Sequence, residues 1–441
     1  MRYRKGRWVL VTALAVTLPL VFTAKAAFAD YAPSFTDVVG VGSDTVQNAI
    51  DFLADGFPSG DTGYNALGNL YKLINFDATA DQNARLAYGP DGLGSGTCHP
   101  GTGGTQGTGN ATTTHADKPC TLNPTIILRA GLSPMLRPNG SGGGFTALQN
   151  DVNAGHHYID FSRASSARGS GSPAGTFDDV RIAIDPLKIL VANTTNAVAL
   201  SPAQLKVIYE KSSPCVTWND PQIGGTSSDA IIPILPQVGS GTRSSFLSAI
   251  GSSEGALGNC VSTFEENDPT ALFQTANSAD AIEPMSGGRL NLFKGLLGSG
   301  GSNGYGGFFK DPSCAAETAA PAPACTTGNT ISPTVANLTG TPGGSIGGTL
   351  FGVNRDLFVY FRDADVGTVF PSVKPWQPGS TLNWVRTLFY NPCSGGMTGC
   401  VTIGGVTYGP GGAPYINTSA GQALIQDAGL TPEYVINVPG S

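Results

Sequence analysis

The run Ile182-Ala183-Ile184-Asp185-Pro186-Leu187-Lys188-Ile189-Leu190-Val191 is apolar and rich in β-branched residues, although it includes one Pro and one Lys. Such a run predicts a buried strand. Downstream, Ser201-Pro202-Ala203-Gln204 has the residues of a helix start, with Ser at the N-cap and Pro at the first helical position. Leu205–Tyr209 continues this helix. A buried strand followed by a capped helix is the repeating unit of an α/β fold.

Strand-like and helix-like segments alternate along most of the chain. Apolar residues at helical spacing, such as Val46, Ile50 and Leu53, predict helices, and short apolar runs predict strands. The alternation indicates an α/β fold with mostly parallel sheets. We expect helices at 45–55, 145–152, 201–209 and 244–250, strands at 71–76, 125–129, 158–161, 182–191 and 231–235, a Gly/Thr-rich insertion at about 87–120, and further apolar segments at 357–361, 384–390 and 420–428.

The N-terminus has the three parts of a secretory signal peptide. Met1–Arg7 carries four basic residues and no acidic one, an apolar stretch runs from Trp8 to Phe22, and Ala27-Phe28-Ala29 supplies small residues before Asp30. The apolar stretch is shorter than the ~20 residues of a membrane span. No Cys near the cleavage site could carry a lipid anchor. We therefore expect residues 1–29 to be removed and the mature chain to be secreted.

The composition favours a globular protein with long polar loops. Only 12% of the 441 residues are charged, and there are 61 glycines and 31 prolines. Aliphatic runs nevertheless recur, which a disordered chain would lack. The net charge of −7 gives no reason to expect a nucleic acid or an anionic membrane as partner. An acidic chain can still bind an anion, because the donors at the site decide that binding.

Eight cysteines in an exported chain favour disulfides. There is no C-x-x-C pair, and the four histidines show no zinc-type spacing with the cysteines, so we expect no metal site and no cofactor. Pairing of sequence neighbours is one connectivity among many, and it would close four separate loops. It joins Cys98 to Cys120, Cys215 to Cys260, Cys314 to Cys325, and Cys393 to Cys400.

Four Ser/Gly segments have the residues of an anion site, and three of them run directly into an expected helix. A helix N-terminus presents unpaired N–H groups and partial positive charge. Gly lets the backbone approach a ligand, and Ser or Thr adds a hydroxyl donor. Any single segment could equally be a plain helix cap. The segments are Gly40-Val41-Gly42-Ser43-Asp44-Thr45, Asn139-Gly140-Ser141-Gly142-Gly143-Gly144, Ser162-Arg163-Ala164-Ser165-Ser166 and Gly239-Ser240-Gly241-Thr242-Arg243.

Taken in order, these segments resemble the phosphate-binding proteins of ABC transport systems, in the form found in secreted actinobacterial relatives. The resemblance covers much of residues 36–290 and extends more weakly to the C-terminal part. Besides the four segments, its landmarks are Asn75-Phe76-Asp77-Ala78-Thr79, Arg137-Pro138, Ile159-Asp160-Phe161, and the stretch from Gln204-Leu205 to Trp218-Asn219.

The resemblance implies a two-lobed type II periplasmic-binding-protein-like fold, with a hinge between two mostly parallel sheets. We expect lobe 1 to hold residues 30–190 and 350–441, and lobe 2 to hold residues 191–349. A phosphate or similar tetrahedral oxyanion would bind between the lobes of a monomer that delivers it to an ABC permease. The binding residues carried over by position are Ser43, Asp44, Thr45, Ser141, Ser240, Gly241 and Thr242.

Two positions depart from the family pattern. A carboxylate that accepts the hydroxyl of hydrogen phosphate often follows the Asp-Phe landmark, where this chain has Ser165 and Ser166. Asp44 is the nearest substitute. Relatives also carry an Arg four residues before the Ser of Ser-Gly-Thr, where this chain has Pro236. Arg163 and Arg243 are then the candidate cations, with structural ion pairing as the alternative for each.

Two other functions are compatible with parts of the sequence. A secreted binding or scaffold protein of the same fold could have lost transport, as the missing lipid-anchor Cys suggests. A serine hydrolase is the enzymatic alternative. None of its G-x-S-x-G matches is followed by a His, so the order Ser–acid–His cannot be met, and we expect no enzyme. The matches are 251–255, 300–304 and 343–347.

Overall fold

A computed structural model describes most of the chain from Ala32 onward. The expected signal peptide and most of the expected insertion at 87–120 lie outside the described residues. The described ranges are 32–57, 61–69, 71–78, 112–115, 118–121, 125–166, 176–193, 195–267, 271–272, 275–298, 335–366, 384–393 and 397–436.

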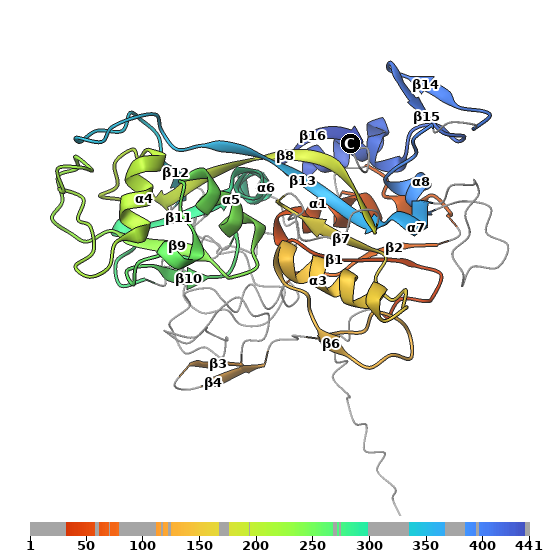
Figure 1. The fold of residues 1–441 in the computed structure, drawn as a ribbon, viewed down its shortest axis with the longest axis horizontal. Helices are drawn as coiled ribbons and strands as arrows, with labels where there is room; N and C mark the ends of the chain where they lie inside the picture. Colours follow the sequence, from red (N-terminus) through yellow and green to blue (C-terminus); the bar gives the residue numbers. More distant parts are fainter. Residues whose placement is uncertain are drawn as a thin grey trace, which may run out of the picture. The chain divides into compact units, whose positions relative to one another are not determined.

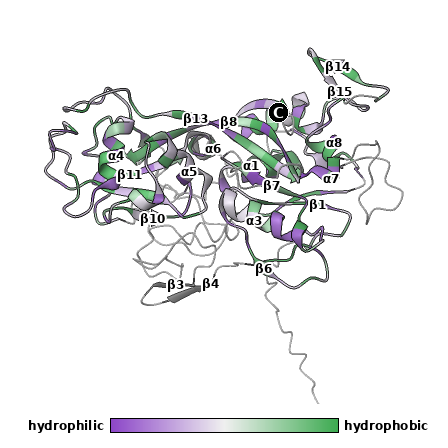
Figure 2. Cartoon of the chain, in the orientation of Figure 1, coloured by the Kyte–Doolittle hydropathy of each residue, from purple (hydrophilic) through white to green (hydrophobic). Residues whose placement is uncertain are grey.

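Two long strands form the centre of a ten-stranded sheet (Figure 1). They are β8 (Phe177–Ala192) and β13 (Val353–Arg362), which pair antiparallel from Val353–Leu187 to Arg362–Phe177. The buried strand expected at 182–191 is therefore the second half of β8. In Figure 2 both strands carry long hydrophobic stretches.

Three strands continue the sheet on the β13 side and are parallel to each other. They are β7 (Phe161–Ala164), β1 (Val38–Gly42) and β2 (Leu73–Asn75). Helix α1 (Asp44–Asp55) follows β1, and α3 (Gly140–Asn153) contacts both β7 and β1. These three strands and two helices are called the β1 group below.

Three other strands continue the sheet on the β8 side, and they too are parallel. They are β9 (Ile232–Pro236), β10 (Ser262–Phe264) and β11 (Ala281–Ser286). With α4 (Pro202–Glu210) and α5 (Gly241–Ala249) they form the β9 group. A separate hydrophobic cluster drawn from Leu187 to Phe351 fills this group, and it includes the fully buried Trp218.

The α/β class expected from the sequence is confirmed, but the sheet is mixed rather than mostly parallel. Its strands are parallel within each group, and β8 is antiparallel to β13, β11, β12 (Val335–Asn337) and β16 (Thr431–Ile436). Pro186 lies where the partner of β8 changes from β16, which ends its pairing at Ile184, to β11, which begins at Leu187. Pro lacks an N–H, so a break between partners is a position that it tolerates.

Several helices begin or end close to the expected residues. The helix expected at 45–55 is α1, that at 201–209 is α4, and the apolar segment 420–428 is α9 (Ser419–Asp427). Ser201 forms the N-cap of α4, within a capping box completed by Gln204.

Two helices begin earlier than expected, because Gly-rich segments form their first turns. Helix α3 begins at Gly140 and α5 at Gly241, against expected starts at 145 and 244. Gly144 shows why Gly is required in α3: a Cβ there would lie 2.3 Å from the Cα of Gly42. The close packing of α3 on β1 outweighs the poor helix propensity of Gly.

The strand expected at 158–161 is observed as β7 at Phe161–Ala164. The N–H groups of Tyr158 and Ile159 donate to the carboxylate of Asp151 at 3.0 and 3.2 Å, so they are not available to a sheet ladder. The strands expected at 71–76 and 125–129 are shorter, at Leu73–Asn75 and Thr125–Ile126.

The remaining elements are short apart from α6. They are η1 (Tyr64–Ala66), β3 (Thr112–His115), β4 (Lys118–Thr121), β5 (Thr125–Ile126), β6 (Met135–Leu136), η2 (Glu254–Ala256), η4 (Ser278–Asp280), α6 (Gly287–Gly298), α7 (Asp363–Val366), α8 (Trp384–Leu388), β14 (Val401–Ile403), β15 (Val406–Tyr408) and η5 (Tyr415–Asn417).

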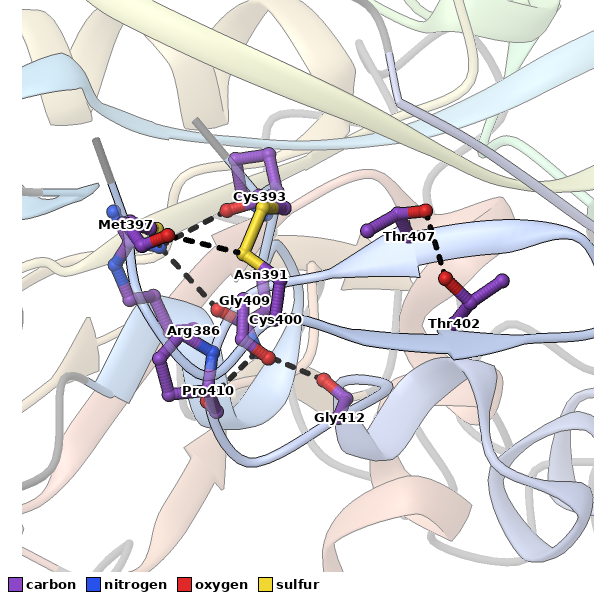
Figure 3. The surroundings of a disulfide bond; sticks show 11 residues. Arg386, Asn391, Cys393, Met397, Cys400, Thr402, Thr407, Gly409, Pro410 and Gly412 are labelled. Atoms are coloured by element: carbon purple, nitrogen blue, oxygen red, sulfur yellow. Dashed lines mark hydrogen bonds between the residues drawn. A yellow bond between two sulfur atoms is a disulfide. The ribbon is translucent and has the colours of Figure 1, made fainter. Parts of the chain in front are cut away.

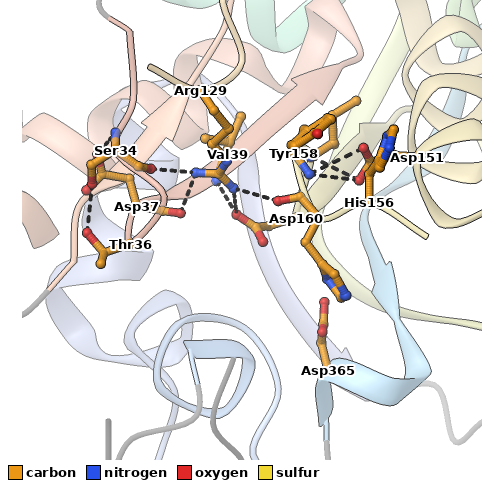
Figure 4. Close-up of polar contacts among 12 residues, drawn as sticks. Ser34, Thr36, Asp37, Val39, Arg129, Asp151, His156, Tyr158, Asp160 and Asp365 are labelled. Carbon is orange, nitrogen blue, oxygen red and sulfur yellow. Dashed lines mark hydrogen bonds and ion pairs between the residues drawn. The ribbon is translucent and has the colours of Figure 1, made fainter. Parts of the chain in front are cut away.

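Buried ion pairs tie the N-terminal segment to β1 and β7 (Figure 4). Arg129 donates to the carboxylate of Asp160 at 2.7 Å, and both side chains are fully buried. The same carboxylate oxygen accepts from the N–H of Val39 at 2.7 Å, while Arg129 also donates to the carbonyl of Asp37 at 2.7 Å. A buried charge pair of this kind is stable only when further hydrogen bonds support it, and here Val39 and Asp37 supply two of them.

Two of the expected disulfides are present. Cys215 is bonded to Cys260, and Cys393 is bonded to Cys400 beside Arg386 (Figure 3). The other two expected pairs, 98–120 and 314–325, depend on cysteines that are not described. In the described ranges, no helix is long and apolar enough to cross a membrane.

The longer disulfide loop should contribute more to stability. The double variant Cys215→Ala/Cys260→Ala removes a link across 45 residues, and Cys393→Ala/Cys400→Ala removes one across 7 residues. Restricting the unfolded chain predicts a loss of about 2–4 kcal/mol for each variant, and the first variant should lose about 1.6 kcal/mol more stability than the second. Chemical denaturation of both variants measures this difference, and equal losses would contradict an origin in loop length.

Candidate functional site

The N-termini of α1, α3 and α5 meet in one place, although α1 and α3 belong to the β1 group and α5 to the β9 group. Thr45 Oγ1 and Thr242 Oγ1, in the first turns of α1 and α5, lie 3.4 Å apart. The N–H of Gly142 in α3 donates to the carbonyl of Gly239, just before α5, at 3.0 Å. Three of the four Ser/Gly segments singled out in the sequence therefore come together.

Gly241 shows how close this approach is. A Cβ at that position would lie 2.5 Å from Ser141 Oγ and 2.3 Å from Ser165 Oγ. Ser141 Oγ accepts from the N–H of Ser165 at 2.9 Å and lies 3.2 Å from its hydroxyl. The fourth Ser/Gly segment thus joins the other three through Ser165.

Two threonine hydroxyls and a guanidinium form the centre of the site. Thr45 and Thr242 both donate to a single oxygen, Glu266 Oε1, at 2.8 and 2.5 Å. Arg355 on β13 donates to the same two hydroxyls, from Nη2 to Thr45 at 3.1 Å and from Nη1 to Thr242 at 2.7 Å. All four residues are buried.

Asp185 on β8 holds Arg355 in position. Its Oδ2 accepts from Arg355 Nε at 2.9 Å and from Nη2 at 2.7 Å. Its Oδ1 accepts from Ser286 Oγ at 2.6 Å and from the N–H of Gly288 at 3.0 Å. The fully buried carboxylate is therefore satisfied on both oxygens, and the guanidinium is fixed with two of its nitrogens directed at the threonines.

Asp44, expected as the acceptor of a ligand hydroxyl, is fully buried at the start of α1. Its Oδ1 accepts from Asn267 Nδ2 at 3.0 Å and lies 3.7 Å from Arg289 Nη2. Asn267 Nδ2 also donates to Thr45 Oγ1 at 3.1 Å. Asp44 therefore lies beside the centre of the site, next to a threonine that belongs to it.

The remaining expected serines occupy different positions around the centre. Ser43 is fully buried, and its hydroxyl has no hydrogen-bond partner among the described residues. Ser240 is the N-cap of α5 and accepts from the N–H of Arg243 at 3.1 Å, which is the role of a plain helix cap. The carbonyl of Ser166 accepts from the hydroxyl of Tyr360 at 2.9 Å.

Arg163, one of the two expected cations, is directed at backbone carbonyls. It donates to Ser43 O at 3.1 Å, Gly42 O at 2.7 Å and Phe76 O at 2.8 Å, and its Nη1 contacts the side-chain oxygen of Asn75. Burial lowers the pKa of Arg163 to about 10. Its visible role is to position the loop between β1 and α1.

Arg243, the other expected cation, is engaged in an ion pair. Its Nε and Nη2 donate to Glu254 at 2.7 and 2.6 Å, and its Nη1 donates to the carbonyl of Pro236 at 2.8 Å. This bidentate contact lowers the pKa of Glu254. Arg243 therefore forms the structural ion pair that the sequence left open as the alternative to ligand binding.

The sequence analysis missed Arg355, Glu266 and Asn267. Arg355 lies two residues before 357–361, which was expected only as an apolar segment. Glu265-Glu266-Asn267 is an acidic pair directly after β10, in a chain with few charges, and this was the one available signal. Nothing local in either stretch shows that it lies beside the Ser/Gly segments.

No protein-family model matches the sequence, and no curated protein matches it. Among solved structures, the chain is similar to a candidate phosphate ABC transporter substrate-binding protein from Clostridium perfringens with bound phosphate (TM-score 0.40, 12% identity, 90% of this chain and 99% of that one). It is also similar to an ABC-type phosphate transport receptor from Vibrio cholerae (TM-score 0.37, 14% identity, 74% and 86%).

Asp51, behind Arg163, should make stability depend on pH. Burial, and then the nearby charge of Asp77, raise the pKa of Asp51 to about 8, although Asn75 donates to it at 2.6 Å. The folded state therefore binds this proton more tightly than the unfolded chain, whose aspartates titrate near 4. The contribution of this proton to the free energy of unfolding is fully present below pH 4 and is lost as the pH rises towards 8.

The variant Asp51→Asn mimics the protonated side chain and should remove this loss. We expect Asp51→Asn to melt at a higher temperature than the wild type, and we expect this difference to be larger at pH 8.5 than at pH 5.5. Calorimetry at the two pH values measures the difference. Asp356→Asn, at a partly exposed surface ion pair, serves as the control. A difference independent of pH would show that Asp51 is ionised in the folded protein throughout this range.

Proposed function

We propose that this chain is a secreted solute-binding protein that holds a tetrahedral oxyanion, with phosphate as the first candidate, between two lobes. The β1 group and the β9 group are the bodies of the two lobes. The boundaries remain those expected from the sequence, with residues 30–190 and 350–441 in lobe 1 and residues 191–349 in lobe 2. Its activity is binding and release, without a catalytic step.

The observation that carries this proposal is the convergence of donors on one anionic oxygen. Thr45 from the β1 group and Thr242 from the β9 group both donate to Glu266 Oε1, at 2.8 and 2.5 Å. Arg355 adds positive charge behind them, and the helix N-termini add partial positive charge and N–H groups. These donors therefore bind a carboxylate oxygen, and the oxygens of phosphate are anionic hydrogen-bond acceptors of the same kind.

In this proposal Arg355 is the cation that binds the ligand, a role that the sequence predicted for Arg163 and Arg243. Those two arginines donate to backbone carbonyls and to Glu254. Arg355 is the described guanidinium that donates to hydroxyls of both helices. It also supplies the cation that the family pattern would have placed at Pro236.

Closure of the lobes follows from the position of these donors. Because α1 and α5 belong to different groups of strands, a ligand held by both Thr45 and Thr242 contacts both lobes only when they are close together. The ligand therefore stabilises the closed form by contacts that the open form lacks. β8 and β13 pass from one group to the other and are the proposed hinge strands.

Export and transport complete the proposal. The two observed disulfides fit an extracellular protein. An ABC permease that recognises the closed lobes is the proposed partner, and the protein would act as a monomer. A secreted scaffold that has lost transport is the alternative function, and anion binding distinguishes the two.

The serine hydrolase has no structural support in the two motifs that are described. Gly251–Gly255 follows α5 in a turn that leads into η2, and the serine of the pattern, Ser253, is the N-cap residue of η2. Gly343–Gly347 also lies in a turn. Neither motif stands between a strand and a helix, as a nucleophile elbow requires. The third motif lies outside the described residues.

Phosphate should raise the melting temperature of the mature, disulfide-intact chain more than sulfate does. Binding to the native state adds about 2.7 kcal/mol of stability at a ligand concentration of 100 Kd. The protein is first freed of carried-over anion by partial unfolding and dialysis. Phosphate-selective stabilisation supports the proposal, whereas no response to either anion favours the scaffold alternative.

Thr242→Val tests the site itself, because it removes the hydroxyl and keeps the shape of the side chain. Loss of a hydrogen bond to a charged group costs about 1.5–3 kcal/mol, so phosphate should bind at least about tenfold more weakly in calorimetric titration. The control is Ser244→Ala, which removes a hydroxyl from the same helix that bonds to the carbonyl of Ser240. Equal affinities for the two variants would place the anion elsewhere.

A further inference from the structure

Glu266 already occupies the donors that a ligand would need. It follows β10, its side chain is fully buried, and its Oε1 accepts from Thr45 and Thr242 at 2.8 and 2.5 Å. A carboxylate of the protein's own chain therefore bridges the two groups of strands.

While Glu266 accepts the hydroxyl protons of both threonines, an anion cannot accept from the same two donors. A threonine hydroxyl has one proton to donate and two lone pairs to accept with. Arg355 donates to both hydroxyls, and Asn267 also donates to that of Thr45. Each hydroxyl must therefore direct its single proton at Glu266. Neither can donate to phosphate until that carboxylate leaves.

The second oxygen of the carboxylate is not held as well. Glu266 Oε2 is buried, and it has no hydrogen-bond partner among the described residues. An unsatisfied buried carboxylate oxygen is costly. A phosphate dianion placed beside it would add repulsion at short range, where burial strengthens electrostatic forces. Ligand and carboxylate are therefore expected to exclude each other.

The loop that carries Glu266 is fixed to the β9 group by polar contacts. The N–H of Glu266 donates to Gln237 Oε1 at 2.8 Å, and Gln237 Nε2 donates to Glu265 Oε1 at 3.2 Å. Asn267 adopts a φ of 58°, in the left-handed region that Asn tolerates better than most residues. Its side-chain oxygen accepts from the N–H of Ser286 at 3.0 Å. The carboxylate is thus presented to α1 from the opposite group.

We propose that Glu266 is an internal latch, a carboxylate that takes the place of the oxyanion and closes the two lobes when no ligand is bound. This inference rests on the proposed function. Phosphate must displace the carboxylate, so the latch lowers apparent affinity and lets only a well-matched anion open the site. Removal of the carboxylate frees both hydroxyl protons and at the same time removes the contact that closes the lobes.

Calorimetric titration with inorganic phosphate tests the competition. Glu266→Ala should bind phosphate at least about tenfold more tightly than the wild type, because both donors are free. Glu266→Gln keeps an acceptor oxygen but removes the charge, so it should fall between the two. Glu210→Gln is the matched control. It removes the same charge from α4, where the carboxylate accepts from Ser252 at 2.8 Å away from the site, and it should change the affinity less than threefold.

Weaker phosphate binding by Glu266→Ala would overturn the latch. That result would instead make the carboxylate an acceptor for the hydroxyl of a protonated anion. Affinities of Glu266→Ala and wild type within twofold of each other would overturn it as well.

Small-angle X-ray scattering of the anion-free proteins tests the latch without any ligand. The wild type should be as compact as it is in saturating phosphate, whereas Glu266→Ala should have a larger radius of gyration. An anion-free Glu266→Ala as compact as the wild type would overturn the latch. An expanded Glu266→Ala, in a chain of which neither the wild type nor the variant binds phosphate or sulfate, would keep the latch and reject the oxyanion function.

Discussion

A buried guanidinium requires partners on every side, and Arg355 obtains them from three separate parts of the fold. Asp185 on β8 neutralises its charge, Thr45 on α1 accepts from one nitrogen, and Thr242 on α5 accepts from another. Because an unpaired buried charge is strongly destabilising, these elements must meet where Arg355 places them. Arg355 of β13 therefore links α1 to α5 at the centre of the candidate site.

The other arginines near the site have structural roles. Arg163 donates to three backbone carbonyls around the turn between β1 and α1, and Arg243 joins the loop before α5 to Glu254. The chain thus uses Arg both to shape its anion-binding loops and, through Arg355, to supply their charge. With Glu266 on the same hydroxyls, the donors of the site are occupied even without a ligand.

Much of the fold could be predicted from local sequence. The capping box at Ser201, the helical spacing of α1 and the apolar run in β8 act over a few residues, and each was found where expected. Errors arose where distant contacts override local preference. The first turn of α3 is helical despite its glycines, because Gly144 packs on Gly42. Tyr158 leaves the sheet because Asp151 accepts its N–H.

The sequence by itself determined the class of fold and the Ser/Gly segments that meet at the candidate site, since caps, hydrophobic periodicity and glycine turns are local properties. Tertiary structure alone decided which charged residues join those segments. Arg355 on β13 and Glu266 just after β10 are far apart in the chain, and both contact Thr45 and Thr242 because β13 pairs with β8 and β10 pairs with β9. Hydrogen bonds between residues more than 200 positions apart, such as Thr45 to Glu266, leave no pattern in a single sequence.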